Sequence, residues 1–329
     1  MLKFRTAAKR LLFGFELREA TCAARGFRVT AAAAKARIET IGRAFVCGYD
    51  AALACVGSEE LSCSLGTIDH ELRGFAFEGA GMALMVLDLV DPRRSKRWKD
   101  FVDGPGNSHI YMVHIGGGWA FARLPGGRAL LERFLARCDE RFMWLVVDGY
   151  GFHHGFFEPA RAVDRRERPT FRSAYAARAF DQGLGRSLWF VEGADVDRVV
   201  ARVQMFEPAR RADLLSGVGV AAAYAGGIEE EQLSRLAANV GAQLPDLQLG
   251  VAFAATARWQ AGNPSAYTAA ASKAICASSD TGLAQLGTQL LDEVLAAPQD
   301  NFPPDPYPNH YERARAQLRS AIQGSRSSC

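Results

Sequence analysis

The densest group of potentially reactive side chains lies between Trp144 and Glu158. Asp148 follows four apolar residues, and His153 and His154 come shortly after it among several aromatic residues. Because burial disfavours a charged carboxylate, an acid in such surroundings has a raised pKa and can donate a proton near neutral pH. Aromatic faces can stabilise the cation that results. We therefore take Asp148 as a candidate general acid, with His153 or His154 as its partner in proton transfer.

The same cluster also supports a purely structural interpretation. Asp148 could cap a helix or form an ion pair with an arginine from a distant part of the chain, and one histidine could be hydrogen-bonded in the core. Asp148 lies five residues before His153 and six before His154. A regular helix would not bring these three side chains together, so a bend at Gly149 or Gly151 would be needed.

Candidate binding residues come from this cluster and from three other segments. Asp181 and Arg186 lie five residues apart, which is off-register for an ion pair within one helix, so we expect each to reach another helix. Glu78 and Ser216 each precede a glycine and could face one another across a cleft. The aromatic rings near Asp148 could line an apolar site, and they belong to Trp144, Tyr150, Phe152 and Phe156.

Other familiar sites find little support. The adjacent histidines could bind a metal ion with Asp148 or Glu158, but neighbouring side chains on a regular element point in different directions. The segment Gly116-Gly117-Gly118 does not follow the dinucleotide-binding pattern, and no Walker, G-x-S-x-G, H-E-x-x-H or D-D-x-x-D pattern occurs. We therefore expect no metal and no cofactor.

An internal similarity predicts that the candidate residues are held by two related halves. Residues 43–48 (RAFVCG) recur as 178–183 (RAFDQG), residues 79–83 (GAGMA) as 217–221 (GVGVA), and residues 118–122 (GWAFA) as 250–254 (GVAFA). The shifts are 135, 138 and 132 residues, and the blocks keep their order, which is typical of a duplication. Two such halves would pack around a shared cleft, where we expect the site to lie.

Helical periodicity prevails along the chain, and strand-like runs are few and short, so the sequence predicts an almost entirely α-helical protein. We expect an N-terminal helical arm over residues 1–42, the two halves over 43–160 and 173–297, a charged connector over 161–172, and a proline-rich strap with a final helix over 298–329.

Pairs of glycines two residues apart recur inside the predicted helices. Each glycine in a helix costs about 1 kcal/mol relative to alanine. Either close crossing of helices or room for a ligand must compensate. The pairs are Gly79 and Gly81, Gly149 and Gly151, Gly183 and Gly185, and Gly217 and Gly219.

Composition excludes some classes of function. The 329 residues are 49% hydrophobic and carry a net charge of only +3, without a basic stripe, so we expect no nucleic-acid partner. The odd count of seven cysteines, with no C-x-x-C pair, favours free thiols in the cytoplasm. No apolar run is long enough for a membrane span. The basic, amphipathic first 15 residues are typical of a docking helix, with weak contact to a membrane surface as the alternative.

Four long stretches resemble a bacterial domain-of-unknown-function family, the UnbL-like proteins encoded beside the polyketide synthase of enediyne gene clusters and in other secondary-metabolite clusters. The stretches are ELRGFAFEGAGMA, VDGYGFHHGFF, RAFDQGLGRSLWF and RRADLLSGVGVAAAYAGG. The resemblance extends from about Arg25 to Ala261. It implies a part in building or processing a polyene-derived or similarly apolar natural product, and it assigns no role to any residue.

Two functional hypotheses follow. The first is a cofactor-independent enzyme that binds an apolar unsaturated chain and starts the cyclisation or isomerisation of a polyene or isoprenoid by proton transfer from Asp148. The alternative is a non-catalytic accessory protein that holds an intermediate or partners the polyketide synthase. A helical-repeat scaffold is a third hypothesis, which the different polar clusters of the two halves disfavour.

Overall fold

The computed structural model describes residues 14, 16–91, 96–139, 141–296 and 310–326 of the chain. These residues form helices joined by short connections, and none of them lies in a β-strand, so the predicted all-α class is confirmed. The expected proline-rich strap and the first 13 residues lie outside the described residues. No helix within the described ranges has the length and apolar character needed to cross a membrane.

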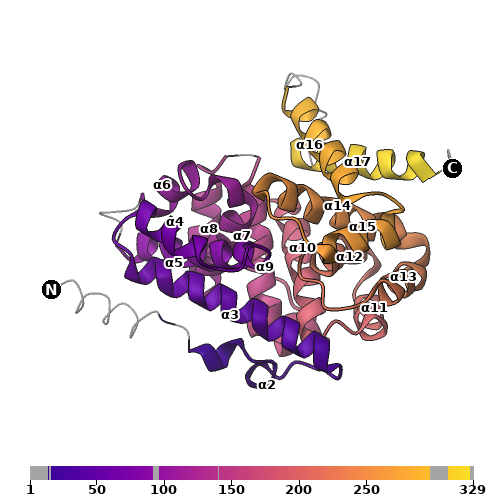
Figure 1. Ribbon diagram of the computed structural model, residues 1–329, viewed down its shortest axis with the longest axis horizontal. Coiled ribbons are helices and arrows are strands. Elements are labelled where there is room, and N and C mark those ends of the chain that lie inside the picture. Colours follow the sequence, from indigo (N-terminus) through magenta and orange to yellow (C-terminus); the bar gives the residue numbers. More distant parts are fainter. Residues whose placement is uncertain (1–13, 15, 92–95, 140, 297–309, 327–329) are drawn as a thin grey trace.

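The fold is built on a series of main helices, each of which packs chiefly against the next (Figure 1). They are α3 (Ala32–Ala54), α5 (Arg73–Val90), α7 (Ile110–Ala122), α9 (Met143–Phe157), α10 (Ala174–Val191), α12 (Pro208–Tyr224), α14 (Leu244–Ala261) and α16 (Asp280–Ala296). The segments Tyr111–Ile115 and Leu145–Val147, which have β-forming side chains, lie inside α7 and α9.

Shorter helices connect the main ones and cover them. They are α4 (Ser58–Gly66), α6 (Arg97–Asp103), α8 (Gly127–Leu135), α11 (Val196–Gln204), α13 (Glu230–Asn239) and α15 (Ala266–Cys276). The remaining elements are the single turns η1 (Leu17–Ala20), η3 (Asn107–His109), η4 (Ala160–Asp164) and η5 (Gly241–Gln243), the short α2 (Cys22–Arg25), and the final helix α17 (His310–Arg326).

Local signals place several helix ends where the sequence predicts them. The Asp195 side chain accepts a hydrogen bond from the Arg198 backbone N–H at 3.0 Å and so caps α11. Pro208 occupies the first turn of α12, where its missing N–H is not needed. After the end of α12, Gly226 and Gly227 have φ values of 69° and 100°, which other residues rarely adopt.

Glycine allows neighbouring main helices to come into backbone contact. A Cβ on Gly149 would lie 1.9 Å from the carbonyl oxygen of Ile115, and one on Gly183 would lie 1.8 Å from that of Asp148. Real Cβ atoms essentially never approach closer than 3.0 Å. Close helix crossing therefore explains the glycine pairs, and the idea that they leave room for a ligand is wrong.

These contacts repeat in one register along seven main helices. Each of these helices has one residue, which we call the register residue, at the crossing with its neighbour. In the first six helices, the carbonyl oxygen of the register residue lies against a glycine of the next helix, and that glycine directly follows the next register residue. In the same six helices, the third residue after the register residue is also a glycine, and it lies against a carbonyl oxygen of the next helix. The register residues are Phe45, Glu78, Ile115, Asp148, Gln182, Ser216 and Leu249.

The register residues follow one another at intervals of 33 to 37 residues. Four such intervals add up to about the shift between the repeated sequence blocks, so the repeating unit in the structure is a single main helix with its connection. The helix contacts match Phe45 with Gln182 and Ile115 with Leu249, and each of these matches differs by two residues from the alignment of the sequence blocks. The duplication of one half into the other stays a prediction, which the order of elements supports.

The series of main helices curves back on itself. The seventh, α14, contacts α7 and η3. Arg258 of α14 lies 3.0 Å from Glu71, which precedes α5, and Glu71 also pairs with Arg37 of α3 at 2.6 Å. In Figure 1 the earlier helices lie on one side of the molecule and the later ones on the other, with α16 and α17 together at one edge. The curvature leaves an interior that both sides line.

Replacing Gly219 by alanine should destabilise the protein by about 1–3 kcal/mol, as overpacking does. The new Cβ would lie 2.1 Å from the carbonyl oxygen of Leu247, although alanine is the better helix former. Urea unfolding followed by circular dichroism measures the change. Gly66→Ala is the control because its Cβ would meet open space, and it should be neutral or stabilising. Equal stability of the two variants would refute the close-packing interpretation.

Candidate functional site

A large apolar cavity, chamber 1, lies between the earlier and the later main helices. It holds about 980 Å³ of empty space, counted out to its opening, and α5, α7, α9, α10, α12, α14, α16 and α17 all contribute to its wall. Its apolar lining includes Phe75, Met112, Ile115, Leu145, Phe190, Val220, Tyr224, Phe253, Leu291 and Leu318, and its polar lining includes Tyr111, Arg141, Asp148, Gln182, Arg186 and Thr256.

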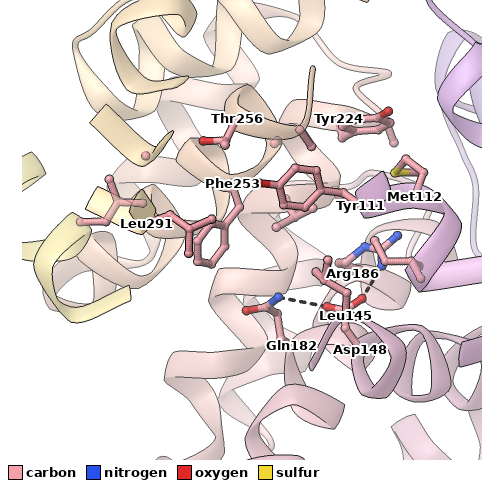
Figure 2. A pocket seen from close by; sticks show the side chains of 18 of the residues that line it. Tyr111, Met112, Leu145, Asp148, Gln182, Arg186, Tyr224, Phe253, Thr256 and Leu291 are labelled. Carbon is pink, nitrogen blue, oxygen red and sulfur yellow. Dashed lines mark hydrogen bonds and ion pairs between the residues drawn. The ribbon is translucent and has the colours of Figure 1, made fainter. Parts of the chain in front are cut away.

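The helical register determines which side chains enter the interior. On α10 the register residue Gln182 lines chamber 1, together with Arg186 four residues later and Phe190 eight residues later. Residues four apart lie on one face of a helix, and α9 presents a similar stripe, with Asp148 in chamber 1 and Phe152 and Phe156 in chamber 2. Figure 2 shows the result, with Gln182 and Arg186 joined to Asp148 and the rings of Tyr111 and Phe253 nearby.

A second cavity, chamber 2, adjoins the first and is richer in aromatic rings. It holds about 620 Å³ and is lined by α3, α5, α7, α9 and α10 together with the η1 turn. Phe45, Trp119, Phe152 and Phe156 form a continuous row, with ring centroids 4.5, 4.9 and 5.5 Å apart in that order.

The wall between the two chambers contains three shared residues, which are Phe75, Arg186 and Phe190. The Arg186 guanidinium also lies over the Phe152 ring, 4.9 Å from its centroid. Arg186 is therefore in contact with both cavities and with the aromatic row.

Arg186 holds two carboxylates from different helices, one on each side of the wall. It donates a short hydrogen bond to Asp148, which lines chamber 1 and also accepts a hydrogen bond from Gln182 Nε2 at 3.1 Å. Its other terminal nitrogen lies 3.6 Å from Oε1 of Glu78, which lines chamber 2. All of these side chains are buried. Asp148 thus forms an ion pair with an arginine from a distant part of the chain, as the structural interpretation of the sequence proposed.

The charges in this group do not balance if both carboxylates are ionised, because one guanidinium faces two of them. Burial raises the pKa of Asp148, and the Arg186 guanidinium opposes that effect most strongly. Burial raises the pKa of Glu78 to about 7, with Arg186 opposing and the nearby Asp148 adding to the increase. Because Asp148 has the two hydrogen bonds and Glu78 Oε1 has none, we place the proton on Glu78 near neutral pH.

The final helix closes chamber 1 and is coupled to the charged group. Ala314 and Leu318 of α17 are part of the chamber wall. Arg315 is buried and donates hydrogen bonds to Gln182 Oε1 at 2.5 Å and to Asp213 at 2.9 Å. Gln182 Oε1 also accepts a hydrogen bond of 3.4 Å from Ser216, so Ser216 takes part in this network rather than facing Glu78.

The structure does not bring the two histidines to Asp148. The α9 helix is continuous from Met143 to Phe157, without the bend that such a contact would need. His153 stacks on Phe157 at 4.5 Å, and burial holds its pKa well below the ordinary value. His154 lies 3.5 Å from Glu158. Neither histidine lines chamber 1 or chamber 2.

Three other predicted binding residues lie in the core, away from both chambers. Trp144 packs edge-on against Tyr175 at 4.8 Å, and Tyr150 packs against His154 at 4.6 Å. Asp181 pairs with Arg210 at 2.6 Å and with Arg168 at 2.5 Å. Asp181 therefore reaches other elements, as the sequence predicts, and holds the connector 161–172 in place. Phe152, Phe156, Glu78 and Arg186 do line a chamber.

Sequence reasoning missed Gln182, Arg315 and the chamber residues of α12 and α14. The signal that could have found several of them is positional. Gln182 stands just before a glycine pair and lines chamber 1, and Val220 and Tyr224, which also line it, lie four and eight residues after Ser216, which stands before another pair. Arg315 carries no such signal. Within the described residues, no three His, Cys, Asp or Glu side chains are grouped so that they could hold a metal ion.

Comparison with protein families matches residues 4–322 to the family described as a protein of unknown function, DUF1702. The match covers nearly the whole chain, and the protein belongs to this family. No curated protein and no solved structure matches the chain.

Replacing Arg186 by methionine should destabilise the protein by about 3–5 kcal/mol at pH 8, because two buried carboxylates lose their shared cation. The loss should be smaller at pH 5, where those carboxyl groups can take up protons. Urea unfolding at both pH values measures it. Arg137→Met, at an exposed position, is the control for removal of a positive charge. A small loss that is equal at both pH values would contradict the shared-cation arrangement.

Glu78 should give the protein a pH-dependent stability. The pKa of its carboxyl is about 7 in the folded protein against an ordinary value of 4.5, so the folded state binds more protons between these two pH values. Stability should therefore fall as pH rises from 4.5 to about 7, by on the order of 3 kcal/mol.

The measurement is the free energy of unfolding of the wild type and of Glu78→Gln between pH 5 and 8. The variant should lack this decrease, whereas Glu59→Gln, at an exposed carboxylate, should keep it. Parallel pH profiles for the wild type and Glu78→Gln would show that Glu78 is ionised throughout.

Proposed function

We propose that this protein is an enzyme of secondary-metabolite biosynthesis that binds an apolar, unsaturated small molecule and cyclises or isomerises it by proton transfer from a buried carboxyl group. The observation that carries the proposal is a large apolar cavity with a buried group of charged side chains in its wall. Neither feature is expected of a purely structural helical protein, since interiors are normally filled and buried charges are costly.

The lining of chamber 1 indicates the class of ligand. The roughly 980 Å³ of empty space in it includes open solvent at its mouth, so the side chains of the wall, rather than this volume, decide the class of ligand. Rings and aliphatic side chains from eight helices form most of its wall. Such a surface binds a molecule through burial of apolar area, at about 25 cal/mol for each Å².

The arginines of chamber 1 favour a neutral ligand over an anionic one. Arg186 is held by Asp148, and Arg141 pairs with Asp139 at 2.6 Å. A phosphate group would have to compete with these carboxylates for its cation. An uncharged polyene or isoprenoid needs no such partner.

In this proposal the proton comes from one of the two carboxyl groups beside Arg186, those of Asp148 and Glu78. Perturbed acids in a cavity are candidates for acid–base catalysis. The sequence resemblance to proteins of enediyne and related gene clusters supports an apolar, unsaturated substrate. It comes from the segments around Glu78, Asp148 and Arg186.

The alternative is a non-catalytic accessory protein that holds an intermediate for the polyketide synthase. One observation favours it: Asp148 is paired with Arg186, and the histidines proposed to exchange its proton lie elsewhere. Both functions require an occupied chamber 1. They differ in whether the carboxyl groups can be replaced without loss of product.

The neutral fluorescent polyene 1,6-diphenylhexatriene should bind the full-length protein and gain fluorescence as it leaves water. Ala257→Trp places an indole in chamber 1 and should weaken binding by at least about tenfold, which corresponds to 1.4 kcal/mol. Ala129→Trp adds the same group at an exposed position on α8 and should have no effect. Wild-type protein that does not bind the probe, or identical binding by both variants, would refute the proposed function.

A further inference from the structure

We propose that chamber 2 is the reaction chamber of a two-part site. In this proposal Glu78, rather than Asp148, is the catalytic acid, and it protonates a carbon–carbon double bond of an elongated neutral molecule whose other end lies in chamber 1. The inference rests on the proposed function and adds to it a second cavity, a proton donor and a substrate shape.

The two carboxyl groups beside Arg186 differ in their hydrogen bonds. Asp148 accepts hydrogen bonds from both Arg186 and Gln182. Glu78 is only 3% exposed, and its Oε1 makes no hydrogen bond, with the nearest Arg186 nitrogen at 3.6 Å. A buried oxygen without a partner is costly when it is charged and much less so when it is protonated. The geometry therefore places the available proton on the chamber 2 side of Arg186.

The charged surroundings of Glu78 allow that proton to be given and recovered. The neighbouring helices bring Arg186 from α10 and Asp148 from α9, while α3 and α7 bring the rings of Phe45 and Trp119. After proton transfer the Glu78 carboxylate would still have the Arg186 guanidinium beside it. The pKa of about 7 supports this exchange, since an acid is most useful near its working pH.

The aromatic row lines the same cavity as Glu78. Phe45, Trp119, Phe152 and Phe156 present ring faces to chamber 2 or to one another. Aromatic faces attract positive charge through their quadrupole. Asp148 lies in the other chamber, whose lining lacks this row. The chamber that contains the proton donor is therefore also the one suited to a carbocation.

The reaction balances without a further reactant. The Glu78 O–H bond breaks and its proton forms a C–H bond at one end of the double bond, which leaves a cation at the other carbon and a carboxylate on Glu78. A second double bond of the same molecule can attack this cation and close a ring. Loss of a proton from the neighbouring carbon to the Glu78 carboxylate then restores the acid, and the product is an isomer of the substrate.

The shared wall indicates an elongated substrate. Phe75, Arg186 and Phe190 form the wall between the two chambers, so a chain that occupies both must move these side chains apart and then lies beside Arg186 and Glu78. The part in chamber 1 would be held by apolar contacts alone, and the part in chamber 2 would react.

The proton position can be tested by infrared spectroscopy on the full-length protein. The wild type at pH 6 should show the C=O band of a buried, protonated carboxylic acid. That band should be missing from Glu78→Gln and present in Asp148→Asn, which is the matched amide replacement on the other side of Arg186. Circular dichroism verifies that both variants are folded. A band that disappears only in Asp148→Asn, or survives in both, would overturn the proposal.

The role in the reaction can be tested by returning the gene to a producing strain that lacks it. Glu78→Gln should abolish the metabolite while the purified variant still binds diphenylhexatriene, because chamber 1 is intact. Ala20→Trp, which fills chamber 2, should have the same two effects. If Glu78→Gln restores the metabolite, the role of Glu78 fails although chamber 1 stands. If the wild type does not bind the probe, the proposed function itself fails.

Discussion

Backbone contact between successive main helices is the constraint on which the rest of this structure depends. At six crossings, one helix approaches so closely that only a residue without a Cβ fits against the carbonyl oxygen of its neighbour. This fixes the rotation of each helix about its axis, and with it the residues that face the interior. Glu78, Asp148 and Gln182 are register residues, so the same contacts that pack the helices also place the polar groups of the site.

The electrostatics of the interior follow from that placement. Arg186 is one turn beyond Gln182 on the same face of α10, and it reaches a carboxylate from α9 and another from α5. One cation cannot fully satisfy two buried anions, and burial together with the nearby Asp148 raises the pKa of Glu78 to about 7. The network then extends through Gln182 to Arg315 on the helix that closes chamber 1. The wall of chamber 1 formed by α17 and the charged group at Arg186 are therefore connected through Gln182 and Arg315.

The sequence was sufficient for the fold class, because that depends on local periodicity. It showed that the glycine pairs need a compensating cause, but it left close helix crossing and room for a ligand as alternatives, and only the packed structure decides for close crossing. It also identified Asp148, Arg186 and Glu78 as notable polar residues in apolar surroundings. It could not show that Arg186 is the partner of Asp148, since that contact joins residues 38 apart through tertiary packing. The prediction for the two histidines was wrong because it depended on their aromatic neighbours in the sequence. In the structure His153 stacks on Phe157 and His154 lies beside Glu158, and neither histidine lines a chamber. The burial of Arg315 could not be predicted, because the helix that contains it is mostly polar.

The most direct test of this account is a crystal structure of the full-length protein with a bound neutral polyene. The account predicts continuous ligand density that extends from chamber 1 past Arg186 into chamber 2, with one double bond beside the Glu78 carboxyl and the rings of Trp119 and Phe152 facing it. Ligand bound on the outer surface with both chambers closed by repacked side chains, or a Glu78 carboxyl turned away from the cavity, would contradict it.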